Sequence, residues 1–206
     1  LEPWLTELRG RPLAMLGAPL RGVLAADSAT AVARERLLHA RRPKDAADGG
    51  LRRRAAAATA TGYADLLEHL RPGVTERALQ VELEAGFFRG GAARTGYGTI
   101  VGIGPNSAVL HFEPGARAAR AGDFVLIDAG GEIDRYVTDV TRTYVVGPPS
   151  SFQRDLHQIV LACEERTITR CVAGAEWREI HLAAAVDLTA GLVSLGVLRG
   201  AADSLV

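Results

Sequence analysis

The sequence contains 206 residues, enough for one large domain, or one domain and part of another, with a substantial hydrophobic core. Lysine and arginine together number 24, as do aspartate and glutamate, and this zero net charge excludes a strong electrostatic attraction to nucleic acid or to an anionic membrane surface. Hydrophobic residues make up 48% of the chain and charged residues 23%, which excludes a disordered chain.

The first segment, residues 1–44, mixes short apolar pieces with glycine and proline and ends in a charged run. This composition is typical of the end of one folded unit and a polar linker to the next. We therefore expect residues 1–44 to be the C-terminal remnant of an N-terminal domain with its linker. Residues 45–206 are expected to form the N-terminal part of a second domain.

Two helices are expected next. From Leu51, apolar residues recur every three or four positions until the breaker at 71–73, which is the period of an amphipathic helix. Thr75 is a favourable N-cap preceded by the apolar Val74, and it predicts a second helix that ends at the glycine pair 90–91.

The hydrophobic period then changes to two, which predicts strands around a turn at 104–106. We expect four strands, at 99–101, 108–112, 124–130 and 136–146. Ser150 and Gln153 form a capping box that opens a helix to about residue 172, and Gly174 is placed as its C-cap. A last helix is expected from about residue 176 toward Gly196.

This order of elements predicts an α+β fold with an antiparallel sheet. The second helix pair repeats the first pair, but no strands follow it. We therefore expect an incomplete sheet, as in half of a domain that was cut short.

Cys163 and Cys171 are the two cysteines. On one helix they would lie about 12 Å apart along its axis, beyond the reach of a disulfide. Two free thiols favour a reducing compartment, so we expect a cytoplasmic protein. The most apolar stretch, 181–198, carries Asp187 and two glycines, which argues against a membrane span, and the first residues show no signal-peptide pattern.

Asp128 and Asp139 lie on the two longest expected strands. A hairpin centred on 133–134 places them opposite one another on one side of the sheet. Carboxylates about 5 Å apart across a ladder repel, so a cation between them or a shared proton is expected. Hard oxygen ligands on rigid strands suit a pair of divalent cations. The alternative is a different register, in which the aspartates cap turns or pair with Arg135 and Arg142.

His111 lies on the expected strand 108–112 among apolar neighbours. A histidine in that setting is most often a buried core residue, and its functional alternative is a proton donor or substrate hydrogen bonder beside the metal pair. The other histidines are expected at the surface or in packing. The sequence lacks Gly-x-Ser-x-Gly, His-Glu-x-x-His, Cys-x-x-Cys and phosphate-loop motifs, which leaves no nucleophile motif and no nucleotide site.

Four segments together resemble the pita-bread (creatinase/aminopeptidase) metallopeptidases. They are 97–106, the run around His111, 126–132 and 136–144. Within that group the chain is most similar to Xaa-Pro aminopeptidase (aminopeptidase P), and next to Xaa-Pro dipeptidase (prolidase). The resemblance extends from about Lys44 to the end, and the motif from Asp128 to Tyr144 is its most specific part.

The resemblance implies an enzyme that removes the N-terminal residue of peptides with proline at the second position, using two divalent metal ions, usually manganese. Asp128 and Asp139 match metal ligands of the family, and His111 matches the residue that helps to bind substrate and to shuttle protons. A water made acidic by two cations attacks the scissile carbonyl. The implied partner is a peptide, with no nucleic acid and no membrane, and a homo-oligomer is among the expectations.

The sequence also departs from the family. Relatives complete the metal site with a histidine in a His-x-x-Gly-His-like motif and two glutamates on later strands, but no glutamate follows Glu179. Two aspartates alone cannot hold two cations tightly. We therefore expect an internal fragment that lacks peptidase activity as written, with an open sheet edge and an exposed apolar face.

Other functions stay open at this point. Prolidase is the enzymatic alternative, and a creatinase or methionine aminopeptidase would share the fold. A non-catalytic peptide-binding module is the alternative from another class, although retention of a repelling pair, Asp128 and Asp139, argues against it.

Overall fold

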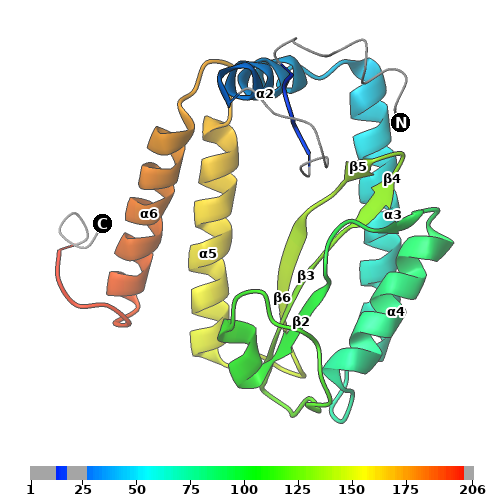
Figure 1. Ribbon diagram of the computed structural model, residues 1–206. Coiled ribbons are helices and arrows are strands. Elements are labelled where there is room, and N and C mark those ends of the chain that lie inside the picture. The colour runs from blue at the N-terminus through cyan, green and yellow to red at the C-terminus, as the bar shows by residue number, and fades with distance from the viewer. Residues whose placement is uncertain (1–12, 18–26, 202–206) are drawn as a thin grey trace.

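The computed structural model describes residues 13–17 and 27–201 (Figure 1). Its elements in chain order are α2 (Asp27–Arg41), α3 (Ala46–His69), α4 (Glu76–Arg89), β1 (Arg94–Thr95), β2 (Ile100–Ile103), the 3-10 helix η1 (Gly104–Ala108), β3 (Phe124–Ala129), β4 (Gly131–Ile133), β5 (Tyr136–Val137), β6 (Val140–Val145), α5 (Ser151–Arg170) and α6 (Trp177–Ser194). After α2, this is the expected α+β order of two helices, strands and two helices.

The strands form two antiparallel sheets, in the orders β1-β4-β5 and β2-β3-β6. The chain passes from β3 to β4 through Gly130 and returns from β5 to β6 through 138–139, so one long hairpin contributes to both sheets. Gly130 is required at this crossing, because a Cβ there would lie 1.7 Å from the carbonyl oxygen of Thr138. The strand expected at 136–146 is therefore two strands with a break, and the break contains Asp139.

The hydrophobic core lies between the sheets and the helices α3 and α4. Alternate residues of β3, Val125, Ile127 and Ala129, are buried in it together with Leu83 and Phe87 of α4. Figure 1 shows α3 and α4 on one side of the strands and the pair α5 and α6 on the other. The intervening residues of β3, which include Asp128, therefore belong to the face turned away from α3 and α4.

The helix ends follow their capping residues. Asp45 and Asp48 form a capping box, so α3 begins before the expected Leu51. The predicted cap at Thr75 and the predicted box of Ser150 and Gln153 are confirmed. Gly174 is not the C-cap of α5, which is Cys171; it has a φ of 85° in the turn before α6.

Two expectations about local structure are wrong. Residues 108–112 do not form a strand, because Gly104 takes a φ of 57° and, with Pro105, opens the 3-10 helix η1, which ends at Ala108. Leu110 is then 89% exposed, so its apolar side chain does not mark a buried strand. Residues 27–41, for which the sequence predicted no helix, form the helix α2, which buries no residue. The rest of the expected domain remnant, 1–12 and 18–26, lies outside the described residues.

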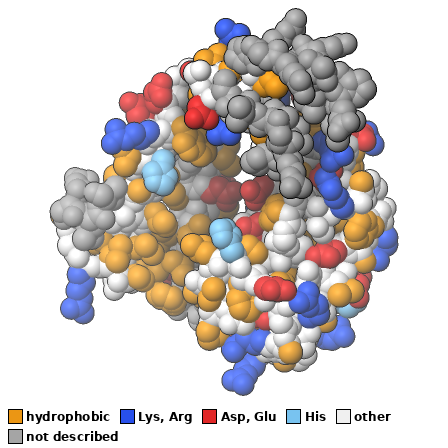
Figure 2. All heavy atoms as spheres, in the orientation of Figure 1, with side chains coloured by type: hydrophobic (Ala, Val, Ile, Leu, Met, Phe, Trp, Pro, Cys, Tyr) orange, Lys and Arg blue, Asp and Glu red, His pale blue; other side chains and the backbone are white. Residues whose placement is uncertain are grey.

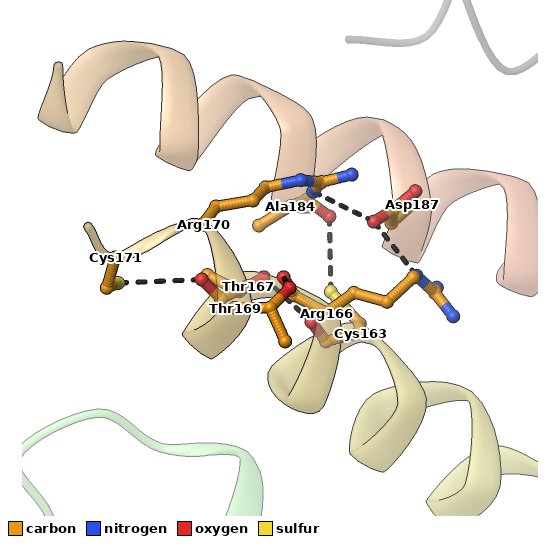
Figure 3. Close-up of polar contacts among 8 residues, drawn as sticks. All are labelled: Cys163, Arg166, Thr167, Thr169, Arg170, Cys171, Ala184 and Asp187. Atoms are coloured by element: carbon orange, nitrogen blue, oxygen red, sulfur yellow. Dashed lines mark hydrogen bonds and ion pairs between the residues drawn. The ribbon is translucent and has the colours of Figure 1, made fainter. Parts of the chain in front are cut away.

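Helices α5 and α6 pack against each other as an antiparallel pair (Figure 3). Asp187 accepts hydrogen bonds from Arg166 Nε at 3.1 Å and Arg170 Nη1 at 3.0 Å, and the Cys163 thiol donates to the carbonyl of Ala184 at 3.4 Å. The hydrogen bond from Arg166 is the main cause that lowers the pKa of Asp187. Both cysteines are free, as predicted.

An apolar cavity of about 800 Å³ separates α5 from the face of β3 and β6 that carries Phe124, Leu126 and Val145. Leu156 and Val160 of α5 line its other side. Among residues 13–17 and 27–201, no helix has the length and hydropathy that a membrane crossing requires.

Candidate metal centre

The strand register brings Asp128 and Asp139 together, but not directly opposite one another. Asp128 pairs with Thr141, and Ala129 pairs with Val140. Asp139 lies two residues before Thr141, so the expected pairing is wrong by two positions. A shift of two residues keeps a side chain on the same face of a sheet, and the two carboxylates therefore still share one side.

Tyr97 joins the two carboxylates. Its hydroxyl lies 2.5 Å from Asp128 Oδ1 and 3.2 Å from Asp139 Oδ1, so both side chains converge on a single oxygen. The alternative pairing with arginine is not seen: within the described residues, no ion pair joins either aspartate to Arg135 or Arg142. Arg142 instead donates to the carbonyl of Thr141 at 2.8 Å.

The electrostatics of the site keep the Tyr97 hydroxyl protonated. Burial, then the hydrogen bond to Asp128, then the negative charges of Asp128 and Asp139, raise the pKa of Tyr97 far above its ordinary value. Tyr97 is therefore a neutral donor between two acids. A neutral hydroxyl cannot cancel the repulsion between two negative charges, which leaves a place where a cation is favourable.

Two side chains of α3 hold the backbone on either side of the aspartates. The Tyr63 hydroxyl lies 3.2 Å from the carbonyl oxygen of Ile127 and 2.5 Å from that of Val140. These residues directly precede Asp128 and follow Asp139, and burial raises the pKa of Tyr63, so it stays a donor. The buried Thr59 hydroxyl bonds that of Thr138 at 2.6 Å and accepts from the Gly131 N–H at 2.9 Å.

His111 lies at the same cavity as the aspartates. The cavity has a volume of about 450 Å³, and its lining includes Tyr97, His111, Glu113, Asp128 and Asp139. Figure 2 shows acidic side chains at the floor of a hollow near the centre of this face. His111 is exposed rather than packed in the core, with a backbone φ of 53°. The structure thus brings together all three site residues expected from the sequence.

The residues present fit a divalent cation in kind but not in number. Two carboxylates on rigid backbone are hard oxygen donors, the type that Mg²⁺, Mn²⁺ and Ca²⁺ prefer. Within the described part of the chain, no group of three or more His, Cys, Asp or Glu side chains is arranged to hold a metal ion. By themselves, Asp128 and Asp139 would fill only part of the coordination shell of a bound cation.

Tyr97, Tyr63 and Thr59 received no role from the sequence. Tyr97 stands in one of the family-like segments, but a lone tyrosine before a strand carries no spacing signal for a metal site. Tyr63 and Thr59 fall on the buried side of α3, where a sequence pattern indicates only packing.

Comparisons with known proteins show the family of this chain. The model of metallopeptidase family M24 matches residues 51–200. Xaa-Pro aminopeptidase from Escherichia coli (strain K12) is 38% identical over 155 residues, which cover 75% of this chain and 35% of that protein.

Solved structures show the same fold. The structure of Pseudomonas aeruginosa aminopeptidase PepP matches with a TM-score of 0.79 and 39% identity, over 83% of this chain and 39% of that one. Zinc-substituted E. coli aminopeptidase P in complex with product matches with a TM-score of 0.75 and 36% identity, over 79% of this chain and 37% of that one. This chain spans little more than a third of the length of these relatives. It belongs to metallopeptidase family M24, and its α+β architecture is part of the pita-bread fold.

Proposed function

We propose that this chain is part of a metal-dependent Xaa-Pro aminopeptidase, which releases the N-terminal residue of a peptide whose second residue is proline. The convergence of Asp128 and Asp139 on the Tyr97 hydroxyl, with His111 at the same cavity, is the observation that carries the proposal. The names of the similar proteins support it. The two free cysteines support a cytoplasmic location.

Each residue has a distinct role in this proposal. Asp128 and Asp139 hold two divalent cations, which we propose are manganese, and such a pair supplies a water acidic enough to attack a carbonyl at neutral pH. Tyr97 orients the two carboxylates through its hydrogen bonds. His111 binds the substrate and moves a proton to or from it.

We further propose that residues 45–206 are the first part of the catalytic domain and that residues 1–44 end an N-terminal domain. The match of the family model to residues 51–200, which leaves residues 1–44 outside it, supports this division. The remaining metal ligands then come from a later segment. On this proposal the chain alone is inactive.

The proposal is tested with the full-length protein, manganese and an Ala-Pro-Xaa peptide. We expect release of alanine, and we expect Asp128→Asn to abolish it, because an amide is a neutral and weaker ligand. Absence of cleavage, or activity that survives Asp128→Asn, contradicts the aminopeptidase. Cleavage of Gly-Pro but not of a longer Gly-Pro peptide would instead identify a dipeptidase, and a metal content near zero would favour a peptide-binding module.

A further inference from the structure

Residues 104–114 form the loop that carries His111, and we call them the His111 loop. At His111 the backbone φ of 53° is a left-handed conformation that a side chain disfavours. Within the described residues, the His111 side chain has no hydrogen bond or ion pair. The position of the imidazole therefore follows from the loop backbone, and contacts elsewhere must hold that backbone.

Glu76, the first residue of α4, makes such contacts. It is fully buried, with 0% of its surface exposed. Its Oε1 accepts hydrogen bonds from the backbone N–H of Ile103 at 3.0 Å and from Asn106 Nδ2 at 2.8 Å. Its Oε2 accepts from the backbone N–H of Gly115 at 3.0 Å. Since Ile103 and Gly115 flank the His111 loop, one carboxylate joins the two ends of the loop.

Capping of α4 does not explain this burial. Thr75 already caps the helix, by accepting a hydrogen bond from the Ala78 N–H at 3.1 Å. An acidic residue that only stabilises a helix dipole can stay in water, whereas Glu76 has exchanged water for three N–H donors. All three donors belong to residues 103–115, so the carboxylate is specific for this segment.

We propose that Glu76 is a positioning residue, which fixes both ends of the His111 loop and thereby holds His111 beside Asp128 and Asp139. This inference rests on the proposed function, in which His111 binds substrate and transfers a proton. Glu76 does not line the cavity of the two aspartates, so its effect on the reaction passes through the loop.

The test compares Glu76→Gln with Glu82→Gln in the full-length enzyme. Glutamine keeps the size of the side chain but replaces one acceptor oxygen with an NH₂ group, which cannot accept the hydrogen bond at one end of the loop. Glu82 is the matched control, because it lies on the same helix and, among the described residues, has no hydrogen bond or ion pair. We expect kcat/KM to fall about tenfold or more in Glu76→Gln and to change less than about twofold in Glu82→Gln.

The double variant with His111→Ala separates positioning from a general structural role. If Glu76 acts through His111, adding Glu76→Gln to His111→Ala lowers kcat/KM by less than about a further twofold. A full additional loss would mean that Glu76 supports the fold or the metal ligands, and the proposal would be overturned. If Glu76→Gln does not fold, Asn106→Ala removes one of the three hydrogen bonds and should give about a threefold loss, again only when His111 is present.

Hydrogen exchange gives a second measurement that does not depend on activity. In Glu76→Gln the backbone amide that loses its acceptor, that of Ile103 or that of Gly115, should exchange faster than in the wild type, and both amides should exchange at the wild-type rate in Glu82→Gln. Unchanged protection overturns the inference. An inactive wild-type enzyme contradicts the proposed function, whereas an active wild type with an equally active Glu76→Gln variant contradicts this inference alone.

Discussion

Tyr97 supplies a hydroxyl that both candidate metal ligands share. Its hydroxyl faces Asp128 at 2.5 Å and Asp139 at 3.2 Å, and so offers a donor to two groups that repel each other. The hydroxyl has one proton, so it can donate a hydrogen bond to only one of the two carboxylates at a time. Without a cation, the strand backbone and the Tyr97 hydroxyl keep the two carboxylates close together. A bound cation would neutralise their charges.

Tyr97→Phe should destabilise the metal-free chain. The substitution removes the donor and leaves the carboxylates facing an apolar ring edge, so we expect the free energy of unfolding to fall by about 1–2 kcal/mol. Tyr144→Phe is the control, since within the described residues the Tyr144 hydroxyl has no hydrogen bond. Urea denaturation at pH 7 measures both, and equal stabilities of the two variants would contradict the role of the hydroxyl.

The stability difference between wild type and Tyr97→Phe should also depend on pH. The pKa of Tyr97 is raised in the folded protein from its ordinary value of 10.0, so above pH 10 the folded state keeps a proton that the unfolded state loses. The stability that this group contributes is complete below pH 10 and is lost as the pH rises further. The difference in stability between wild type and Tyr97→Phe should therefore shrink between pH 10 and pH 12, and a constant difference would contradict the shift.

At the scale of the elements, the close packing of α3 against α4 fixes the position of the helices that support the strands of the site. Gly62 and Gly86 meet there, and a Cβ on Gly86 would lie 2.4 Å from the Cα of Gly62. This close approach lets Phe87 pack with 0% exposure in the core that β3 also enters. Tyr63 and Thr59, close to Gly62 on α3, form hydrogen bonds with the strands.

Gly86→Ala and Gly50→Ala should have opposite effects. At Gly86 the new methyl group collides with helix backbone that cannot move aside, and we expect a loss of about 1–3 kcal/mol in the free energy of unfolding. Gly50 lies in α3 with nothing within 4 Å of its added Cβ, so there alanine should stabilise by about 0.5–1 kcal/mol through helix propensity. Denaturant titrations decide, and a neutral Gly86→Ala would show that the helices can separate.

Much of this architecture was predictable from local signals. The caps at Thr75 and Ser150 were recognised because capping depends on residues within one helical turn. The segment 108–112 was not, because its apolar residues suggest a strand while Gly104 and Pro105 redirect the backbone into η1. Local hydrophobicity does not report where the chain is bent away from the core.

The sequence was enough to bring His111, Asp128 and Asp139 to one cavity, but not to predict the contacts around them. Alternation along β3 places Asp128 on the open face, and a register error of two residues leaves Asp139 on that face as well. The hydrogen bond of Tyr97 with Asp128 joins residues 31 positions apart in the sequence, and that of Glu76 with Gly115 joins residues 39 positions apart. Such contacts exist only once the chain has folded.

At the scale of the whole molecule, the α5 and α6 pair stands across an apolar cavity from the sheet. The sheet face lining this cavity continues toward Asp128, so the site and the cavity share one surface. A chain that supplies two carboxylates at the end of an open apolar surface should bind metal weakly by itself.

Calorimetric titration of the 206-residue chain with Mn²⁺ should give a Kd on the order of 0.1–1 mM, because water must fill most of the coordination shell. Asp128→Asn and Asp139→Asn should each abolish this binding. Asp155→Asn serves as the control, since Asp155 lies on α5 and has no hydrogen bond or ion pair within the described residues. Micromolar binding by this chain, or binding that survives both aspartate substitutions, would contradict the proposed ligands.

The hydrogen bonds that join Tyr63 and Thr59 of α3 to the strands have a further consequence. They hold the strands close to both acids from the buried face of the sheet. A random mutagenesis screen for loss of catalysis should therefore find substitutions of Tyr63 and Thr59 as well as substitutions of Asp128 and Asp139. An inactivating change at either position on α3 would then act through the backbone that carries the two acids.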